Sequence, residues 1–412
     1  MKYQILTGDN RTTLKTIPDN SIDAIVTDPP YGIDFLGKSW DANTGALETY
    51  QECLRVLKPG GHILAFSAAR TYHHLAITLE QAGFEIRDQI MWIYSSGFPK
   101  SQDVGRQLHK KEHGKPDKQR FDPAVMIHLD GDRYQHPDNG KTYRALPDIN
   151  GDRLKVSHEG EKYGTVYEEV IKVNNEWSGW GTCLKPAHEP IALARKPIRL
   201  SIRDNVIKHG VGALNIDATR VPYESEEDKN SIDHKVPTAA WSGHTLQTDS
   251  YKSGQFVRAE TNEQGRFPSN VIGEIEGYQK YFYCPKVSRA ERHIGHETPP
   301  PMFGSVQGAY DSNGNRMAVG LDARTGNVGN NHPTVKPIEL MKYLIRLITP
   351  AGGTVLDPFN GSGSTGCAAV ELGHEYIGCE LDPKYVDIAK TRIEAWYAQA
   401  NPNTFNTLFT TE

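Results

Sequence analysis

The chain has 412 residues, of which 24% are charged and 37% hydrophobic, and its length predicts two to three domains in a folded, water-soluble protein. The sequence has no run of about 18 apolar residues, so we expect no membrane span. It also lacks the apolar core of a signal peptide, and we therefore predict a cytoplasmic protein. The formal net charge of −5 disfavours uniform attraction to nucleic acid, but local charge distribution matters more than the total.

The first 97 residues alternate between strand-like and helix-like segments. Strands are predicted at 3–6, 24–27, 62–66 and 85–94, with a helical turn at 10–16 and helices at 47–57 and 72–82. Gly83 is expected to end the last of these helices. Such alternation is typical of a parallel sheet whose two faces are covered by helices.

The middle of the chain loses this alternation. From residue 97 to about 175 the sequence is polar and rich in turn signals. The apolar run at 188–195 predicts a strand antiparallel to 85–94 that closes the edge of the sheet. From about 196 to 330 the chain is irregular again, and insertions of this length are usually functional loops or disordered segments.

After residue 331 the α/β pattern returns. Helices are predicted at 338–348, 364–372 and 383–398, with strands at 353–356 and 376–379, so both ends of the chain are expected in one sheet. The predicted organisation is two halves of one domain (1–97 and 331–400), a first insertion (98–176), a returning strand (177–196), a second insertion (197–330) and a tail (401–412). Five scattered cysteines lack CxxC spacing, so we expect no metal site and no disulfide framework.

The first motif with chemical content is the run Asp28-Pro29-Pro30-Tyr31, which follows an apolar strand. Open α/β sheets bind ligands at the carboxyl ends of their strands, where this run is expected to lie. Two consecutive prolines fix the backbone and hence the direction of the carbonyl group between them. Asp-Pro-Pro is also common in ordinary turns, so the run alone leaves both interpretations open.

A second motif begins at the end of a predicted strand, where Asp357, Phe359, Gly361 and Gly363 precede a predicted helix. Glycines there allow backbone N–H groups to approach a ligand at the helix N-terminus. Glu380 ends the next strand, as the ribose-binding acid does in dinucleotide folds. No Gly-Lys-Ser/Thr follows the glycines, which excludes a Walker-type ATPase loop.

These two motifs, in this order, resemble the amino-methyltransferases of DNA, specifically their permuted β-type members that act on adenine N6 or cytosine N4. The resemblance covers 1–97, 177–200 and 330–395. It implies an α/β fold with a doubly wound, mostly parallel seven-stranded sheet of the Rossmann-like S-adenosylmethionine-dependent methyltransferase type. Residues 1–97 would be the catalytic half, 331–400 the cofactor half, and the insertions would contact and recognise double-stranded DNA.

The resemblance also assigns roles to individual residues. The Asp28 carboxylate and the Pro29 carbonyl would accept hydrogen bonds from the target amine, Pro30 would hold the turn, and Tyr31 would stack on a flipped-out base. The expected contacts to S-adenosylmethionine come from Asp357 and Phe359 near its methionine part, Gly361 and Gly363 through the loop, Glu380 at the ribose, Asp9 at the adenine, and Lys336 in the segment 332–337.

The predicted activity is methyl transfer from S-adenosylmethionine to N6 of adenine in duplex DNA. Asp before Pro-Pro favours adenine in this family, and cytosine N4 is the alternative. An RNA or protein-amide methyltransferase, or a nucleic-acid-binding module without catalysis, is a less favoured alternative.

Two windows, 100–120 and 185–220, each carry seven basic against three acidic residues and are candidate phosphate contacts. The resemblance leaves a homodimer and a cognate restriction nuclease open, and the sequence implies neither.

Overall fold

The computed structural model describes residues 2–33, 41, 43–94, 101–113, 118–121, 127–130, 133–138, 141–145, 165–169, 175–230, 235–237, 256–258, 262–273, 288–296, 330, 332 and 334–401. The chain divides into two compact units. The larger unit comprises Met1–Ser95, Ala187–His296 and Thr334–Glu412, and the smaller one comprises Ser96–Pro186 and Glu297–Pro333. The larger unit thus contains most of the second predicted insertion. Apart from residue 401, the predicted C-terminal tail lies outside the described residues.

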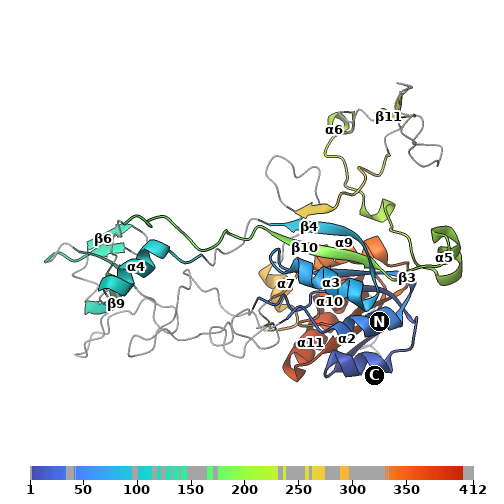
Figure 1. Cartoon of the computed structure of the whole chain (residues 1–412), viewed down its shortest axis with the longest axis horizontal. Coiled ribbons are helices and arrows are strands. Elements are labelled where there is room, and N and C mark those ends of the chain that lie inside the picture. The colour runs from blue at the N-terminus through green and yellow to red at the C-terminus, as the bar shows by residue number, and fades with distance from the viewer. Residues whose placement is uncertain are drawn as a thin grey trace, which may run out of the picture. The chain divides into compact units, whose positions relative to one another are not determined.

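The larger unit is built on a mixed sheet, the main sheet, which has eight strands among the described residues (Figure 1). In spatial order they are β1 (Tyr3–Thr7), β15 (Glu375–Glu380), β14 (Thr354–Asp357), β2 (Ile22–Thr27), β3 (Leu57–Phe66), β10 (His188–Arg195), β4 (Glu85–Ile93) and β13 (Val271–Gly273). β10 is antiparallel to both neighbours, whereas the other adjacent pairs are parallel. As predicted, both ends of the chain meet in one sheet, since β14 pairs with β2 and β1 with β15.

The main sheet differs from the prediction at one edge. The run 188–195 does pair antiparallel with β4, as predicted, but it does not close the sheet. β10 instead lies between β3 and β4, and β13 adds an eighth strand beyond β4. β13 is three residues long, too short for its hydrophobic pattern to be distinguished within an irregular stretch. The insertion of β10 places the start of this strand at the carboxyl ends of its neighbours.

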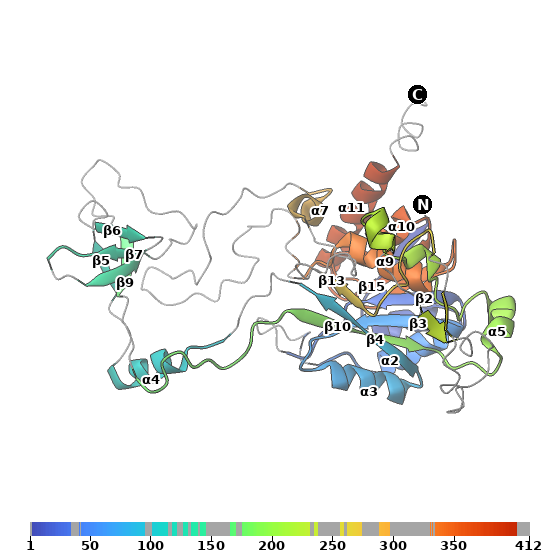
Figure 2. The ribbon, with the colours of Figure 1, turned by 90° about the horizontal axis from the view of Figure 1, so that it is seen from above.

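Helices cover both faces of the main sheet (Figure 2). One face carries α9 (Ile338–Ile348), α10 (Ser364–Glu371) and α11 (Pro383–Ala400), and the other carries α2 (Leu47–Val56) and α3 (Tyr72–Ala82). Each layer encloses its own hydrophobic cluster against the sheet. The central strand β2 is buried at all six positions because both layers pack on it.

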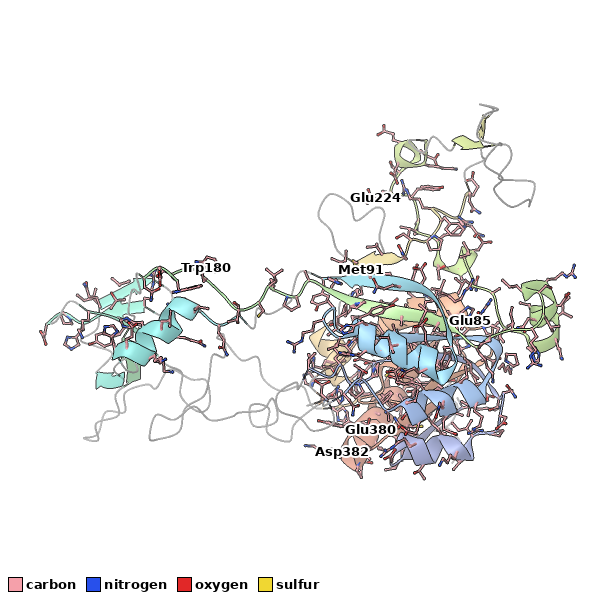
Figure 3. All side chains as sticks on the ribbon, in the orientation of Figure 1. Glu85, Met91, Trp180, Glu224, Glu380 and Asp382 are labelled. Atoms are coloured by element: carbon pink, nitrogen blue, oxygen red, sulfur yellow. The ribbon has the colours of Figure 1, made fainter. Side chains whose placement is uncertain are left out.

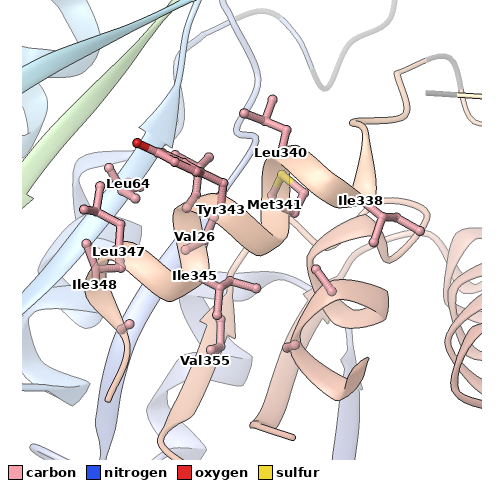
Figure 4. Packing of buried hydrophobic residues seen from close by; sticks show 14 of the residues in the cluster. Val26, Leu64, Ile338, Leu340, Met341, Tyr343, Ile345, Leu347, Ile348 and Val355 are labelled. Atoms are coloured by element: carbon pink, nitrogen blue, oxygen red, sulfur yellow. The ribbon is translucent and has the colours of Figure 1, made fainter. Parts of the chain in front are cut away.

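Helix α9 shows how this packing stabilises the fold. Its apolar side chains, including Ile345 and Ile348, are buried against Val26, Leu64 and Val355 of the sheet (Figure 4). Burying an aliphatic side chain of this size contributes about 1.5–3 kcal/mol relative to leaving it exposed. The helix therefore packs against strands from both ends of the sequence, and these strands share one hydrophobic core with it.

Local signals set the ends of these helices. Gly83 ends α3 in the left-handed conformation, with φ of 105°, as the sequence predicted. The side chain of Asp382 caps α11 by accepting from the backbone N–H of Lys384, and Pro383 follows at the first helical position. Shorter elements of the larger unit are α1 (Asn10–Thr13), η1 (Leu14–Thr16), α5 (Ile202–His209), η5 (Asp217–Thr219), α6 (Glu226–Asn230), α7 (Arg289–His293), β11 (Lys235–Pro237) and β12 (Phe256–Arg258).

In the smaller unit, the described residues form one helix, α4 (Val104–His113), and a five-stranded antiparallel sheet. In spatial order its strands are β5 (Lys118–Phe121), β9 (Thr165–Glu169), β8 (Thr142–Ala145), β7 (Arg133–Gln135) and β6 (Ile127–Asp130). The sequence pattern did not predict these strands, because segments of three to five residues show too little alternation. Across the described ranges, we find no helix with the length and apolar character needed to cross a membrane.

Candidate active site

The predicted motifs meet at one edge of the main sheet. β2, β14 and β15 are parallel neighbours, so their carboxyl ends lie side by side. The Asp28 run follows β2, Asp357 ends β14, and Glu380 ends β15. We refer to this edge as the carboxyl edge. Residues from both ends of the chain therefore form one site.

Asp357 links the end of β14 to the end of β2 through a side-chain hydrogen bond. Its Oδ1 accepts hydrogen bonds from the Thr27 hydroxyl at 2.7 Å and from the backbone N–H of Phe359 at 3.0 Å. Its Oδ2 accepts from the Thr365 hydroxyl at 2.6 Å. Burial raises the pKa of Asp357 to about 6, although these three hydrogen bonds oppose the shift. Asp357 thus fixes the loop after β14 beside the Asp28 run.

The side chains of Asp28, Tyr31, Glu189 and Lys336 meet at the carboxyl edge in a group that we call the Asp28 cluster. Lys336 Nζ donates to Asp28 Oδ2 at 2.7 Å and to the Tyr31 hydroxyl at 3.0 Å, and it lies 3.3 Å from Glu189 Oε2. The Tyr31 hydroxyl lies 2.8 Å from Asp28 Oδ1 and 2.7 Å from Glu189 Oε2. Glu189 reaches the cluster because β10 runs antiparallel and begins at this edge.

The Asp28 cluster is largely shielded from water. The Lys336 side chain is 8% exposed, and those of Asp28 and Glu189 are each 18% exposed. Burial lowers the pKa of Lys336, but Asp28 and Glu189 outweigh that effect, so its pKa lies above the ordinary value. Burial, together with the same two carboxylates, raises the pKa of Tyr31 well above its ordinary value. Lys336 is therefore a cation and Tyr31 keeps its proton at neutral pH.

Asp41 holds the backbone that follows the Asp28 run. Its buried carboxylate accepts from three consecutive backbone N–H groups, those of Tyr31 at 2.6 Å, Gly32 at 3.1 Å and Ile33 at 3.3 Å. Gly32 has φ of 65°, a conformation that favours glycine. This arrangement fixes the direction in which Tyr31 leaves the turn.

The loop between β14 and α10 uses its glycines for two purposes. Gly361 and Gly363 have φ of 52° and 77°, which turn the chain into α10. A Cβ atom on Gly363 would lie 3.0 Å from the Cβ of Ala389, and one on Gly366 would lie 2.4 Å from Cδ1 of Ile393. The small residues therefore also allow α10 to pack closely against α11.

Arg392 supports the same loop from α11. Its side chain is fully buried, and Nη1 donates to the Ser362 carbonyl oxygen at 2.6 Å and to the Ser362 hydroxyl at 3.0 Å. A buried guanidinium that pairs with a loop carbonyl constrains that loop strongly, since the unpaired groups would be costly. Arg392 thus positions the backbone between the two glycines.

Glu380 closes the other side of the loop. Figure 3 labels Glu380 and Asp382, which follow each other closely at the end of β15. The Oε2 atom of Glu380 accepts from the backbone N–H of Gly361 at 2.7 Å, and its Oε1 atom accepts from the N–H of Asp382 at 3.0 Å. Burial raises the pKa of Glu380 to about 7, although both hydrogen bonds oppose the shift. The carboxylate therefore lies beside the glycine loop, at the carboxyl end of β15.

The end of β1 also contacts this loop. Asp9 caps α1 and pairs with the guanidinium of Arg11, which lowers the pKa of Asp9. Asn10 Nδ2 donates to the carbonyl oxygen of Pro358 at 3.0 Å. The side chain that touches the loop is thus Asn10, whereas Asp9 is engaged with its own helix.

Comparison with known proteins assigns this arrangement to a family. The profile of the DNA methylase family that comprises N6 and N4 methyltransferases matches residues 22–391, which is most of the chain. The chain belongs to this DNA methylase family. The predictions of an α/β methyltransferase fold, of a DNA methyltransferase and of S-adenosylmethionine as its cofactor are thereby confirmed.

Several individual proteins are similar to this methyltransferase. The Type II methyltransferase M.HindIII of Haemophilus influenzae is 22% identical, with 94% of each chain covered. M2.DpnII of Streptococcus pneumoniae is 45% identical over 64 residues, or 16% of this chain and 24% of that protein. Among solved structures, the M1.HpyAVI complex with S-adenosylmethionine is 16% identical, covers 95% of this chain and 99% of its own, and has a TM-score of 0.39. The cytosine-N4-specific PvuII methyltransferase is 13% identical, with coverage of 97% and 93% and a TM-score of 0.41.

The sequence predictions and the geometry of the methyltransferase agree in part. Asp28, Pro29, Pro30 and Tyr31 lie at the carboxyl edge beside Asp357, Phe359, Gly361, Gly363 and Glu380, in one unit of the chain. Lys336 contacts Asp28 and Tyr31, and its expected contact with the cofactor stays a prediction. Asp41, Glu189 and Arg392 were not singled out. Glu189 stands in a run that resembles the family, whereas no sequence pattern indicates a site role for Asp41 or Arg392.

Proposed function

We propose that this methyltransferase modifies N6 of a flipped-out adenine at specific sites in duplex DNA. The observation that carries the proposal is the position of Asp28, whose carboxylate follows β2 at the carboxyl edge next to the glycine loop. Asp28, Pro29 and Tyr31 would contact the target base, and the loop side of the site would hold the cofactor. The acid before the two prolines supports adenine over cytosine through the family resemblance.

The described residues suit S-adenosylmethionine. The Glu380 carboxylate would accept from the ribose hydroxyls, and the backbone around Gly361 and Gly363 would border the methionine part. Phe359, partly buried against Tyr50, would offer its ring to the same part of the cofactor. When bound, the cofactor supplies an electrophilic methyl group.

The chain's own residues would activate the amine. The lone pair of an exocyclic amine is delocalised into the ring, so the nitrogen is a poor nucleophile. Hydrogen bonds from its two N–H groups to the Asp28 carboxylate and the Pro29 carbonyl would stabilise the positive charge that develops as the N–C bond forms and the S–C bond breaks. One amine proton is then lost, and the Asp28 carboxylate would accept it as the general base. The neighbouring Lys336 ammonium donates to this carboxylate at 2.7 Å.

A labelled-methyl experiment tests the proposal. The purified chain is incubated with S-adenosylmethionine that carries a tritiated methyl group and with unmethylated duplex DNA, tRNA or bulk protein. We expect label in DNA alone and N6-methyladenine after digestion to nucleosides. Detection of N4-methylcytosine would show that the target base is cytosine and not adenine. Label in tRNA or protein would overturn the proposal. Asp28→Ala, which removes both acceptor oxygens, is the inactive control.

The insertions remain the candidates for reading DNA sequence. The windows 100–120 and 185–220 would hold phosphates, while side chains from 98–176 and 197–330 would contact base edges. The cytoplasmic location stays a prediction from the sequence, and a homodimer and a cognate restriction nuclease stay open possibilities. Sequencing of DNA from a methylation-deficient host that expresses this chain would identify the recognition site.

A further inference from the structure

The hydrogen atoms of the Asp28 cluster can be counted. Lys336 carries three N–H donors, which face Asp28 Oδ2, the Tyr31 oxygen and Glu189 Oε2. The Tyr31 hydroxyl carries a single proton, yet its oxygen lies at hydrogen-bond distance from two carboxylate oxygens, Asp28 Oδ1 and Glu189 Oε2. The proton can therefore be donated to only one of them at a time.

This single proton defines two arrangements of the cluster. When Tyr31 donates to Asp28, both oxygens of the Asp28 carboxylate already receive a donor, one from Tyr31 and one from Lys336. When Tyr31 donates to Glu189, Asp28 Oδ1 receives neither of these donors and can accept from another group. The two O···O distances, 2.8 Å and 2.7 Å, differ by only 0.1 Å, so rotation of the hydroxyl exchanges the arrangements without moving heavy atoms.

We propose that Glu189 is a positioning residue for methyl transfer: by accepting the Tyr31 proton, it removes the competing donor from Asp28 Oδ1, which then accepts a stronger hydrogen bond from the target amine. The inference rests on the proposed function, because it requires an amine at Asp28. It holds equally for adenine and for cytosine. Glu189 acts through Tyr31 and needs no contact with the base.

The surroundings of Glu189 suit this role. The residue lies near the start of β10, where it is paired with Trp92 of β4, and the pairing of β10 with β3 begins two residues later at Ile191. Its carboxylate is 18% exposed, so little water competes for the Tyr31 proton. Lys336 faces Glu189 and Asp28 together and keeps both carboxylates paired with a cation. A neutral side chain at 189 would leave Tyr31 no carboxylate other than Asp28.

The first test is the Glu189→Leu variant. With Tyr31 confined to Asp28, we expect the single-turnover rate of methyl transfer to fall by about 10- to 100-fold, as for a competing hydrogen bond to a charged group. The dissociation constant for S-adenosylmethionine should stay within about twofold of the wild type. Glu189→Gln, which retains a carbonyl acceptor, should give an intermediate rate.

The decisive test is a double variant. Tyr31→Phe removes the competing hydroxyl and keeps the ring, so adding it to Glu189→Leu frees Asp28 Oδ1 again. We expect the double variant to be at least about fivefold faster than Glu189→Leu, although it carries one more substitution. A double variant that is as slow as Glu189→Leu, or slower, would overturn the inference, because a merely structural role cannot be rescued by a second deletion.

A matched control separates this effect from general destabilisation. Glu371 also accepts from a buried lysine, Lys342, at 2.7 Å, but it lies on α10 outside the Asp28 cluster. Glu371→Leu should lower thermal stability and leave the transfer rate unchanged. If the wild type transfers no methyl group, the proposed function fails and this inference with it. If the wild type is active and the rescue is absent, the inference alone fails.

Discussion

Lys336 and Asp28 are 308 positions apart in the sequence, yet Lys336 Nζ donates to Asp28 Oδ2 at 2.7 Å. The contact joins the turn after β2 to the segment before α9, and it places a buried cation against the residue proposed to bind the target amine. Because Glu189 faces the same ammonium, the cation balances two carboxylates. Loss of the lysine would leave two negative charges close together with little water.

We therefore expect Lys336→Met to impair both folding and chemistry. Removing one partner of a buried ion pair costs about 3–5 kcal/mol of unfolding free energy. The transfer rate at saturating cofactor should also fall, since Asp28 and Tyr31 would lose the donor that holds their oxygens in place. Lys342→Met is the matched control, because Lys342 is equally buried and pairs with Glu371 outside the cluster. Denaturant unfolding should show loss of stability in both variants, and single-turnover assays should show loss of rate in Lys336→Met alone.

Asp28→Ala should abolish methyl transfer and leave cofactor affinity nearly unchanged. The carboxylate belongs to the base side of the site, whereas the proposed cofactor contacts follow β14 and β15. Calorimetry with S-adenosylmethionine measures the affinity, and labelled-methyl incorporation measures the activity. Retained activity together with a tenfold or larger loss of affinity would place Asp28 on the cofactor side and contradict the assignment.

Cofactor binding should depend on pH through Glu380. Burial raises the pKa of Glu380 to about 7, so its carboxyl group is mostly protonated at pH 6 and mostly ionised at pH 8. The ionised form is the better acceptor for ribose hydroxyls, so binding favours loss of the proton. We expect affinity to rise by up to about tenfold from pH 6 to pH 8. Glu380→Gln should abolish most of this dependence, and its persistence in that variant would assign it to another group.

The same residue gives a direct affinity test. Glu380→Ala should weaken S-adenosylmethionine binding at pH 8 by about 1.5–3 kcal/mol, as for loss of charge-assisted hydrogen bonds. Asp382→Ala is a suitable neighbouring control, because Asp382 caps α11 and is expected to affect stability more than affinity. Unaltered calorimetry for Glu380→Ala would mean that Glu380 only holds the loop through Gly361.

Most of the main sheet was predictable, because its strands and helices are long enough to show their period. The predicted helices 47–57, 72–82 and 338–348 correspond closely to α2, α3 and α9. The Asp28 run and the glycine loop were found because each stands at a strand end with a distinctive local pattern. The predicted position of β10 at the sheet edge was wrong, because strand order in a sheet is set by packing between segments far apart in the sequence.

Residues that act through distant contacts escaped sequence reasoning. Arg392 stands in a helix whose pattern predicts exposed polar residues, and only its contact with Ser362 across 30 positions shows that it is buried. Glu189 reaches Tyr31 across 158 positions. Contacts of this range depend on the completed fold, so the sequence did not reveal them, even for Glu189, whose run resembles the family.

Arg392→Leu tests the support of the glycine loop. The substitution leaves the Ser362 carbonyl without its buried donor, so we expect a loss of about 1–3 kcal/mol in unfolding free energy. Cofactor affinity should fall as well, because the backbone between Gly361 and Gly363 is no longer held. Lys390→Leu on the exposed side of the same helix is the control and should change neither quantity. Equal affinities in the two variants would show that the loop holds its shape without Arg392.

The last prediction concerns DNA binding by α4. This helix carries Lys110 and Lys111 on its exposed surface, and its first turn is held by a hydrogen bond of 3.0 Å from the N–H of Val104 to the carbonyl oxygen of Trp180. A fixed, basic helix in the first insertion is suited to phosphate contacts, which attract DNA regardless of sequence.

We expect Lys110→Gln and Lys111→Gln together to weaken binding to every duplex tested. The slope of log K against log salt should become shallower by about one to two units, since each lost phosphate contact releases about one counterion fewer. Lys384→Gln with Lys390→Gln, on α11, removes the same charge from another exposed helix and is the control. Cofactor affinity should be unchanged in both pairs. If the α11 pair flattened the salt dependence as much as the α4 pair, the effect would reflect net charge alone, and the first insertion would lose its assignment as a DNA contact.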